Sequence, residues 1–185
     1  MQITNVNLID CSESDCYIEG AALTDVTVDG LLVKDAKPLK LAGCVLNRVT
    51  LRGDLGQIMI RPRLHLAYRH LQPVYDVANS AAYEQVDWAL DISGARGSAV
   101  SVHGIPSRLI RRDPETQAVM TLGQALEGRW REVDLTGTPF GVHTKIILET
   151  GVEDMVLAAD YSSANFAHQV EKLAELRKAG CVLPD

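Results

Sequence analysis

The feature that most constrains the fold of this chain is a five-residue period of apolar side chains over residues 3–53. Every fifth residue from Ile3 to Val33 is aliphatic, with the exception of Glu13. A second apolar residue stands two positions before most of these residues. Turn-forming residues stand two positions after several of them: Asp10, Gly20, Asp25, Gly30 and Asp35. The phase shifts by three around Pro38. The period then resumes at Leu41, Leu46 and Leu51.

A period of five matches neither the 3.6 residues of a helical turn nor the alternation of a strand. It is typical of a chain that turns a corner every five residues and points two side chains inward from each straight face. Stacked turns then bury equivalent positions against one another, as in a solenoid. The composition agrees, because 46% of the residues are hydrophobic but only 5% are aromatic, and narrow interior positions favour small aliphatic side chains. We predict that the structural core contains Leu8, Cys11, Cys16, Ile18, Leu23, Val28, Val33, Leu41, Cys44, Leu46 and Leu51.

Several of these units resemble the repeats of the pentapeptide-repeat family, which run small residue, Asp or Asn, Leu or Phe, polar residue, Gly. Residues 6–8 (VNL), 21–25 (AALTD) and 26–30 (VTVDG) carry the pattern, and residues 44–48 (CVLNR) follow it more loosely. The resemblance covers about 50 residues and implies a short right-handed β-solenoid-like region at the N-terminal end. Some members of that family mimic duplex DNA by presenting an acidic rod to topoisomerases. From this resemblance we expect only that the protein is a binding or self-associating module.

The rest of the chain predicts an α+β fold that ends in an amphipathic helix. Residues 64–85 have helical spacing interrupted by Pro73, and such a segment suits either a cap on the solenoid or a dimer contact. Strands are expected at 86–93, 98–103, 107–112, 116–122, 142–149 and 153–159. The last two flank Thr150-Gly151 and predict a hairpin, and the C-terminal helix is expected within residues 162–180.

These patterns divide the chain into a solenoid-like repeat region (1–60), a helical segment (61–86) and an α+β region (87–185), or join all three in one domain. Within the last region, three units fit the five-residue pattern again: 90–94, 100–104 and 133–137. They predict either a resumed solenoid or ordinary short strands that end at glycine turns.

The net charge of −6 is unevenly distributed along the chain. Residues 1–47 carry a net −4, residues 48–131 a net +3 and residues 132–185 a net −5, and every basic residue of the middle zone is an arginine. This zone is too weakly basic for general nucleic-acid binding. It does contain arginines that are candidates for holding a carboxylate or phosphate, with pairing to the protein's own carboxylates as the alternative. The candidates are Arg61, Arg63, Arg108 and Arg112.

The sequence lacks the patterns of familiar catalytic and metal sites. It has no HExxH pair, no GxSxG elbow, no Walker lysine and no CxxC pair. His65 and His70 are five residues apart and fall on different faces of a helix, unlike a metal-binding pair. Because these patterns are missing, we predict no metal, no cofactor and no catalytic residue. His103 and His143 are the candidate bases if the chain is an enzyme. Among the cysteines, Cys181 is expected to be the most exposed.

No apolar run approaches the length of a membrane span, and the N-terminus lacks the features of a signal peptide, so we expect a cytoplasmic protein with free thiols. A repeat-built core without a catalytic constellation favours a non-catalytic protein-interaction or self-associating module, such as a bacterial cassette or immunity-like protein. Its partner would be another protein or a second copy. The alternatives are a small anionic-ligand-binding protein and an enzyme of unrecognised type.

Overall fold

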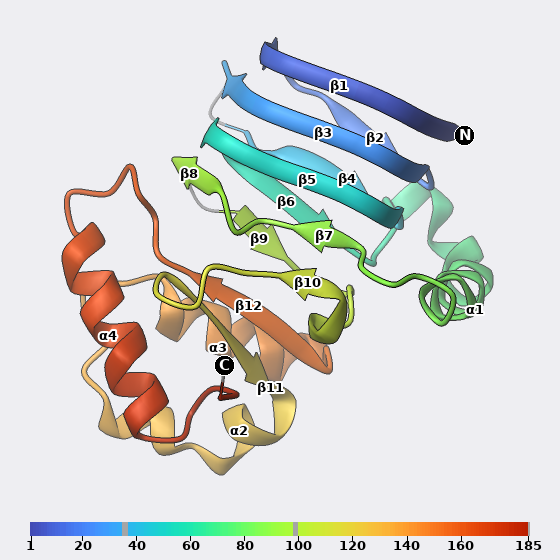
Figure 1. Ribbon diagram of the computed structural model, residues 1–185. Helices are drawn as coiled ribbons and strands as arrows, with labels where there is room; N and C mark the ends of the chain where they lie inside the picture. The colour runs from blue at the N-terminus through green and yellow to red at the C-terminus, as the bar shows by residue number, and fades with distance from the viewer. Residues whose placement is uncertain (35–36, 98–99, 185) are drawn as a thin grey trace.

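The computed structural model describes residues 1–34, 37–97 and 100–184, and these form a mixed α/β structure (Figure 1). Two parallel sheets make up one half of the molecule, and α1 lies beside them. In the other half, helices pack around a two-stranded antiparallel sheet. The predicted combination of strands, helices and a C-terminal helix is therefore confirmed at the level of fold class.

In the parallel half, the chain alternates between the two sheets. The first has the strand order β1 (Gln2–Glu13), β3 (Ala22–Val33), β5 (Val45–Leu55), β7 (Leu90–Asp91) and β10 (Ile110–Arg111), and β8 (Ala95–Gly97) also pairs with β5. The second has the order β2 (Tyr17–Glu19), β4 (Leu39–Ala42), β6 (Ile58–Arg61) and β9 (Val100–Val102). Every pairing described in these two sheets is parallel.

The strand register follows the five-residue period. Gln2 pairs with Ala22, and Ala22 pairs with Val45. The second step is three residues longer than the first, which matches the phase shift around Pro38. Of the later units, 90–94 contains β7 and 100–104 contains β9, whereas 133–137 contains no strand.

Corners occur at every fifth residue, where the backbone adopts a positive φ. In the described part of residues 1–53, these corners are Asn5, Asp10, Asp15, Gly20, Asp25, Gly30, Gly43, Arg48 and Gly53. Glycine, asparagine and aspartate tolerate this conformation best, which explains the turn-forming residues at this spacing. The predicted turn at Asp35 lies outside the described residues.

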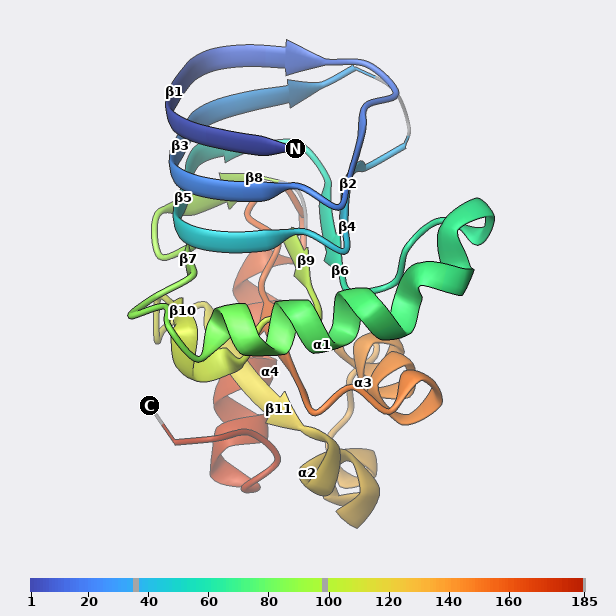
Figure 2. The ribbon, with the colours of Figure 1, turned by 90° about the vertical axis from the view of Figure 1, so that its right-hand side faces the viewer.

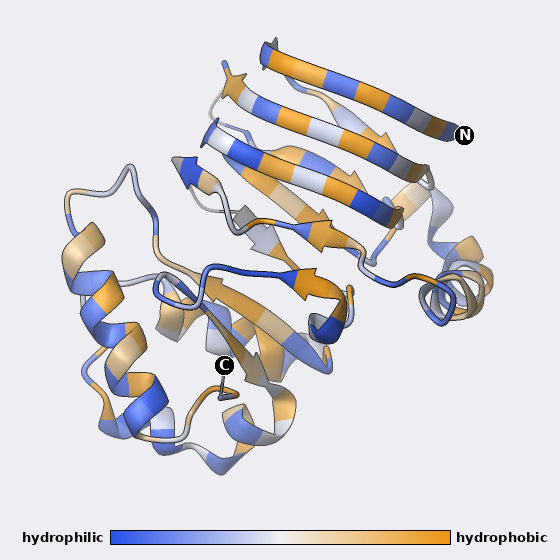
Figure 3. Ribbon diagram, in the orientation of Figure 1, coloured by the Kyte–Doolittle hydropathy of each residue, from blue (hydrophilic) through white to orange (hydrophobic). Residues whose placement is uncertain are grey.

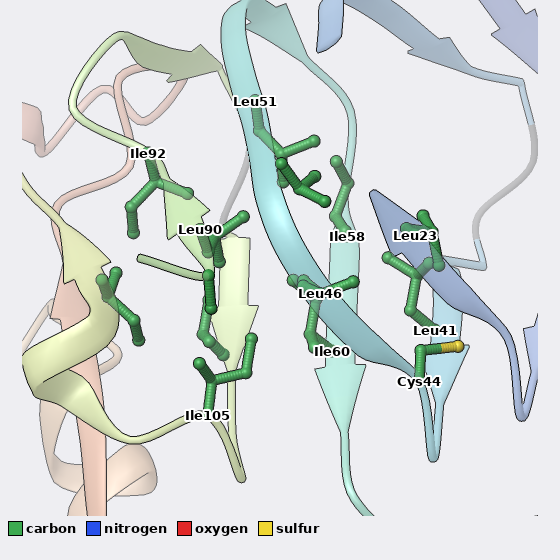
Figure 4. Close-up of a cluster of buried hydrophobic side chains, with 14 of the residues drawn as sticks. Leu23, Leu41, Cys44, Leu46, Leu51, Ile58, Ile60, Leu90, Ile92 and Ile105 are labelled. Carbon is green, nitrogen blue, oxygen red and sulfur yellow. The ribbon is translucent and has the colours of Figure 1, made fainter. Parts of the chain in front are cut away.

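The core of the parallel half lies between the two sheets. Figure 3 shows hydrophobic and hydrophilic residues interspersed along β1, β3 and β5. Figure 4 shows aliphatic side chains from both sheets pointing toward one another. Of the predicted core residues, the buried ones are Leu23, Leu41, Cys44, Leu46 and Leu51. Those that are partly buried against this cluster are Cys11, Ile18, Val28 and Val33.

Leu8 and Cys16 are exposed, so their assignment to the core is wrong. Both belong to residues 1–19, which form the outermost strands of the two sheets, and both line the apolar space between these strands. Val28 is aligned with Leu8 on β3, which has strands on both sides. No described strand lies outside β1 and β2, so side chains of residues 1–19 that point inward still reach solvent.

The predicted helix between residues 64 and 85 is present, as the 3-10 turn η1 (Leu66–Leu71) followed by α1 (Gln72–Tyr83). It is inserted between β6 and β7. The interruption expected at Pro73 is present, because η1 ends at Leu71 and a new helix, α1, begins at Gln72. Pro73 lies in the first turn of α1, where its missing N–H would have no partner within the helix.

The C-terminal half contains β11 (Gln117–Thr121) paired antiparallel with β12 (Asp154–Ala158). The predicted strand at 142–149 is wrong, because these residues belong to α3 (Phe140–Thr150), which ends at Gly151 with φ 67°. The predicted hairpin is therefore a helix-to-strand turn. The remaining helical elements of this half are η2 (Ser107–Leu109), α2 (Leu122–Glu127), η3 (Arg129–Glu132) and α4 (Phe166–Lys178).

Cys181 is buried, contrary to expectation, because the chain after α4 turns back into the core formed with β11 and β12. Among the described residues, no helix is both long and apolar enough to cross a membrane.

Candidate functional site

The parallel half ends at β1 and β2, which are the outermost strands of their sheets. No described strand pairs with the outer edge of either one. β1 is 12 residues long, so this edge presents a long row of backbone N–H and C=O groups. We call the outer face of residues 1–19 the open end; it is at the top of Figure 2.

A pocket of about 360 Å³ lies inside the open end. Most of its lining is apolar, and the side chains that the first turn contributes include Ile3, Val6, Leu8, Cys11, Cys16 and Ile18. Large hydrophobic side chains of the same turn are also exposed outside the pocket: Met1, Ile9 and Tyr17. An exposed apolar surface of this kind, next to two free strand edges, is typical of a protein-interaction site.

Glu13 is the one charged residue among the described residues that line this pocket. It occupies the position where the five-residue period otherwise places an aliphatic side chain. Its Oε2 accepts a hydrogen bond from the backbone N–H of Cys16 at 2.9 Å. Its Oε1 is buried without a hydrogen-bond partner among the described residues. A buried carboxylate oxygen in this state is costly, so the charge of Glu13 is only partly compensated within its own chain.

Two of the three other carboxylates of the open end have partners within the protein. Asp15 pairs with Lys37 at 3.0 Å. Glu19 accepts a hydrogen bond from the backbone N–H of His65, and the Tyr17 hydroxyl donates another at 3.4 Å. The third, Asp10, lines a different pocket, so Glu13 is the carboxylate of the open end that lines the apolar pocket.

The arginines predicted to hold an anion lie on separate segments. Arg61, at the end of β6, donates to the Tyr17 hydroxyl at 3.1 Å, and its guanidinium carbon lies 5.9 Å from the centre of that ring. Arg63 is exposed in the segment after β6, and Arg112 follows β10. Arg108 lies in η2 and lines a pocket of about 630 Å³ that contains none of the other three.

The pocket at Arg108 has an acidic lining. Its carboxylates come from Asp76 and Glu84 on one side and Glu153 and Asp154 on the other. Four carboxylates around one arginine create a negative potential, which opposes the binding of a free carboxylate or phosphate.

The structure places His103 and His143 close enough to interact electrostatically, although 40 positions separate them in the sequence. The Ser101 hydroxyl lies 2.7 Å from Nε2 of His103. Burial and the charge of His103 lower the pKa of His143 to about 4, and Nδ1 of His143 has no partner among the described residues. Neither histidine lines the pocket at the open end or the pocket at Arg108.

Among the described residues, no three His, Cys, Asp or Glu side chains form a group that could hold a metal ion. The open end was not predicted from the sequence as a site. Glu13, the exception to the aliphatic period, is the sequence signal that marks it.

Comparison with known proteins leaves the chain without an assigned family. No family model, no curated protein and no solved structure matches it. The function therefore has to be argued from the geometry of the open end.

Proposed function

We propose that this protein is a non-catalytic interaction module, and that the open end is its binding surface. We further propose that residues 1–60 form a short right-handed β-solenoid-like repeat region related in design to pentapeptide-repeat proteins. The alternation of the chain between two parallel sheets and the corners at every fifth residue support this view.

The observation that carries the proposed function is the uncovered first turn. A β-sheet edge with free N–H and C=O groups can accept a strand from a partner, which gives affinity through backbone hydrogen bonds. The apolar pocket beside it would select the side chains of that strand. Native proteins usually protect such edges, so a long unprotected one beside an apolar pocket favours a binding role.

The two alternative functions have less support. The arginines do not converge on one described pocket, and the pocket at Arg108 is acidic. His103 and His143 interact electrostatically, but neither lines the pocket at the open end or the pocket at Arg108.

A displayed library of random peptides, selected against the full-length protein, tests the proposal. We expect enriched peptides that bind the wild type and slow the hydrogen exchange of β1 backbone amides. The Leu8→Asp substitution places a charge at the pocket and should abolish this binding. Leu126→Asp is the matched control, because Leu126 is also exposed but lies on α2. Peptides that bind both variants equally, or protect other segments, would contradict the proposal.

A further inference from the structure

A second exposed apolar surface lies on η1 and α1. η1 has no buried residue, and exposed large side chains continue into the helix. We call this surface the ridge; it consists of Leu66, Tyr68, Leu71, Val74 and Val77. Val77 is 73% exposed and Leu66 72% exposed. Apolar side chains this exposed and this close together mark a contact surface.

The ridge and the open end together hold most of the exposed large hydrophobic side chains of the described residues. The open end contributes Met1, Leu8, Ile9 and Tyr17. The ridge contributes its five. Only four others are exposed to this degree: Leu32, Leu126, Val142 and Tyr161. Two separate exposed apolar surfaces on one chain suggest that one surface binds the other.

The charges of the two surfaces are opposite. Between Asp54 and Asp76 the chain carries arginines and histidines but no carboxylate. Arg63 and Arg69 are exposed and form no ion pair with a described residue. The open end has the reverse composition, because residues 1–19 contain four carboxylates and no lysine or arginine.

The ridge is held in place by its own chain. The backbone N–H of Leu64 donates to Oε1 of Gln72 at 2.8 Å, and Nε2 of Gln72 donates to the Pro62 carbonyl at 3.0 Å. The His65 ring packs edge-on against Tyr17 at 6.2 Å. Since the segment is already ordered, little conformational entropy is lost when it binds.

The ridge does not cover the open end of its own chain. In Figure 2, η1 and α1 project from the side of the sheets, whereas β1 forms their upper edge. Both surfaces also remain exposed in the single chain. A ridge can therefore fill an open end only between two molecules.

We propose that the open end of one copy binds the ridge of a second copy, with Arg69 placed next to the negative charge of Glu13. This inference rests on the proposed function and names the partner as the protein itself. The contact joins two different surfaces, so each assembled pair keeps one free open end and one free ridge. The assembly therefore grows with concentration or closes into a ring.

Sedimentation equilibrium of the full-length protein over a hundred-fold range of concentration tests this contact. The average mass should rise with concentration beyond that of a dimer or reach that of a closed ring, and should fall as salt is added. Glu13→Lys and Arg69→Glu should each weaken association about tenfold or more. Glu149→Lys reverses an exposed charge on α3 and should leave association unchanged.

Charge exchange distinguishes this contact from a symmetric one. An equimolar mixture of Glu13→Lys and Arg69→Glu should regain association, because each open end then meets a ridge of opposite charge. The double variant should regain it as well. If Glu13→Lys weakens association and Arg69→Glu does not, two open ends meet and the ridge is not the occupant. A monomer at every concentration overturns self-association, while peptide binding at the open end would still support the proposed function.

Discussion

Gly20 is in direct contact with Tyr75 where α1 crosses a corner of the parallel sheets. A Cβ atom at Gly20 would lie 2.5 Å from the hydroxyl oxygen of Tyr75. Gly43, at the corner one turn further along, is similarly close to Leu64 and Tyr75. Both glycines have a positive φ, so they combine the corner conformation with room for the helix.

Gly20→Ala should therefore destabilise the fold through two separate effects. The methyl group is strained at a φ of 61° and also displaces Tyr75, and together these effects should lower the free energy of unfolding by about 2–3 kcal/mol. Gly151→Ala is the matched control. Gly151 has a φ of 67°, but a methyl group there would meet no atom within 4 Å, so only the backbone strain applies, about 1 kcal/mol. Urea denaturation measures the free energy of unfolding of both variants. Equal decreases would contradict the contact with Tyr75.

Tyr83→Phe should detach the C-terminal end of α1 from β5. The Tyr83 hydroxyl accepts a hydrogen bond from the Leu46 N–H at 3.3 Å and donates to the Cys44 carbonyl at 3.5 Å, and burial raises its pKa to about 12. Removing the hydroxyl leaves a buried N–H without its partner, which should cost about 1–2 kcal/mol. Tyr68→Phe changes an exposed ring and should stay within about 0.5 kcal/mol. If both substitutions lower the stability measured by thermal denaturation by the same amount, the hydrogen bonds of Tyr83 contribute nothing to stability.

The repeat is the part of the fold that the sequence can predict, because its signal is local and recurs. The predicted corners at Asp10, Gly20, Asp25 and Gly30 all have positive φ values. The spacing cannot show which turn lacks a neighbour, so it places Leu8 in the core although this side chain is 39% exposed. Exposure depends on what packs against the outer side of residues 1–19, and the apolar period by itself does not indicate that.

The errors in the C-terminal half have a different cause. The apolar residues of 142–149 suit a strand as well as a helix when short windows are compared, and α3 is fixed by packing against β12 and α2. The burial of Cys181 depends on the chain returning to the core after α4, which periodicity does not indicate. The electrostatic interaction between His103 and His143 likewise depends on how the two halves are arranged.

The four thiols should differ in reactivity in the native protein. Cys16 is exposed at the open end, whereas Cys44 and Cys181 are buried and burial raises the pKa of both thiols. A thiol reagent should therefore modify Cys16 first and reach Cys44 and Cys181 only after unfolding. Cys16→Ser should remove the fastest phase, while Cys181→Ser should leave it intact. If Cys16 reacts no faster than Cys44, the open end is covered in solution.

Stability should decrease as the pH falls from about 6.5 toward 4, in part because of His143. The pKa of this side chain is about 4 in the folded protein, lowered first by burial and then by the charge of His103, against an ordinary value of 6.5. Between these values the unfolded chain binds a proton that the folded chain does not. The stability conferred by the neutral form is thus complete above pH 6.5 and falls by up to about 3 kcal/mol by pH 4. His143→Gln keeps a neutral polar side chain and should flatten this dependence, as measured by urea denaturation at several pH values. Wild type and variant with the same pH dependence would show that His143 is protonated without cost in the folded state.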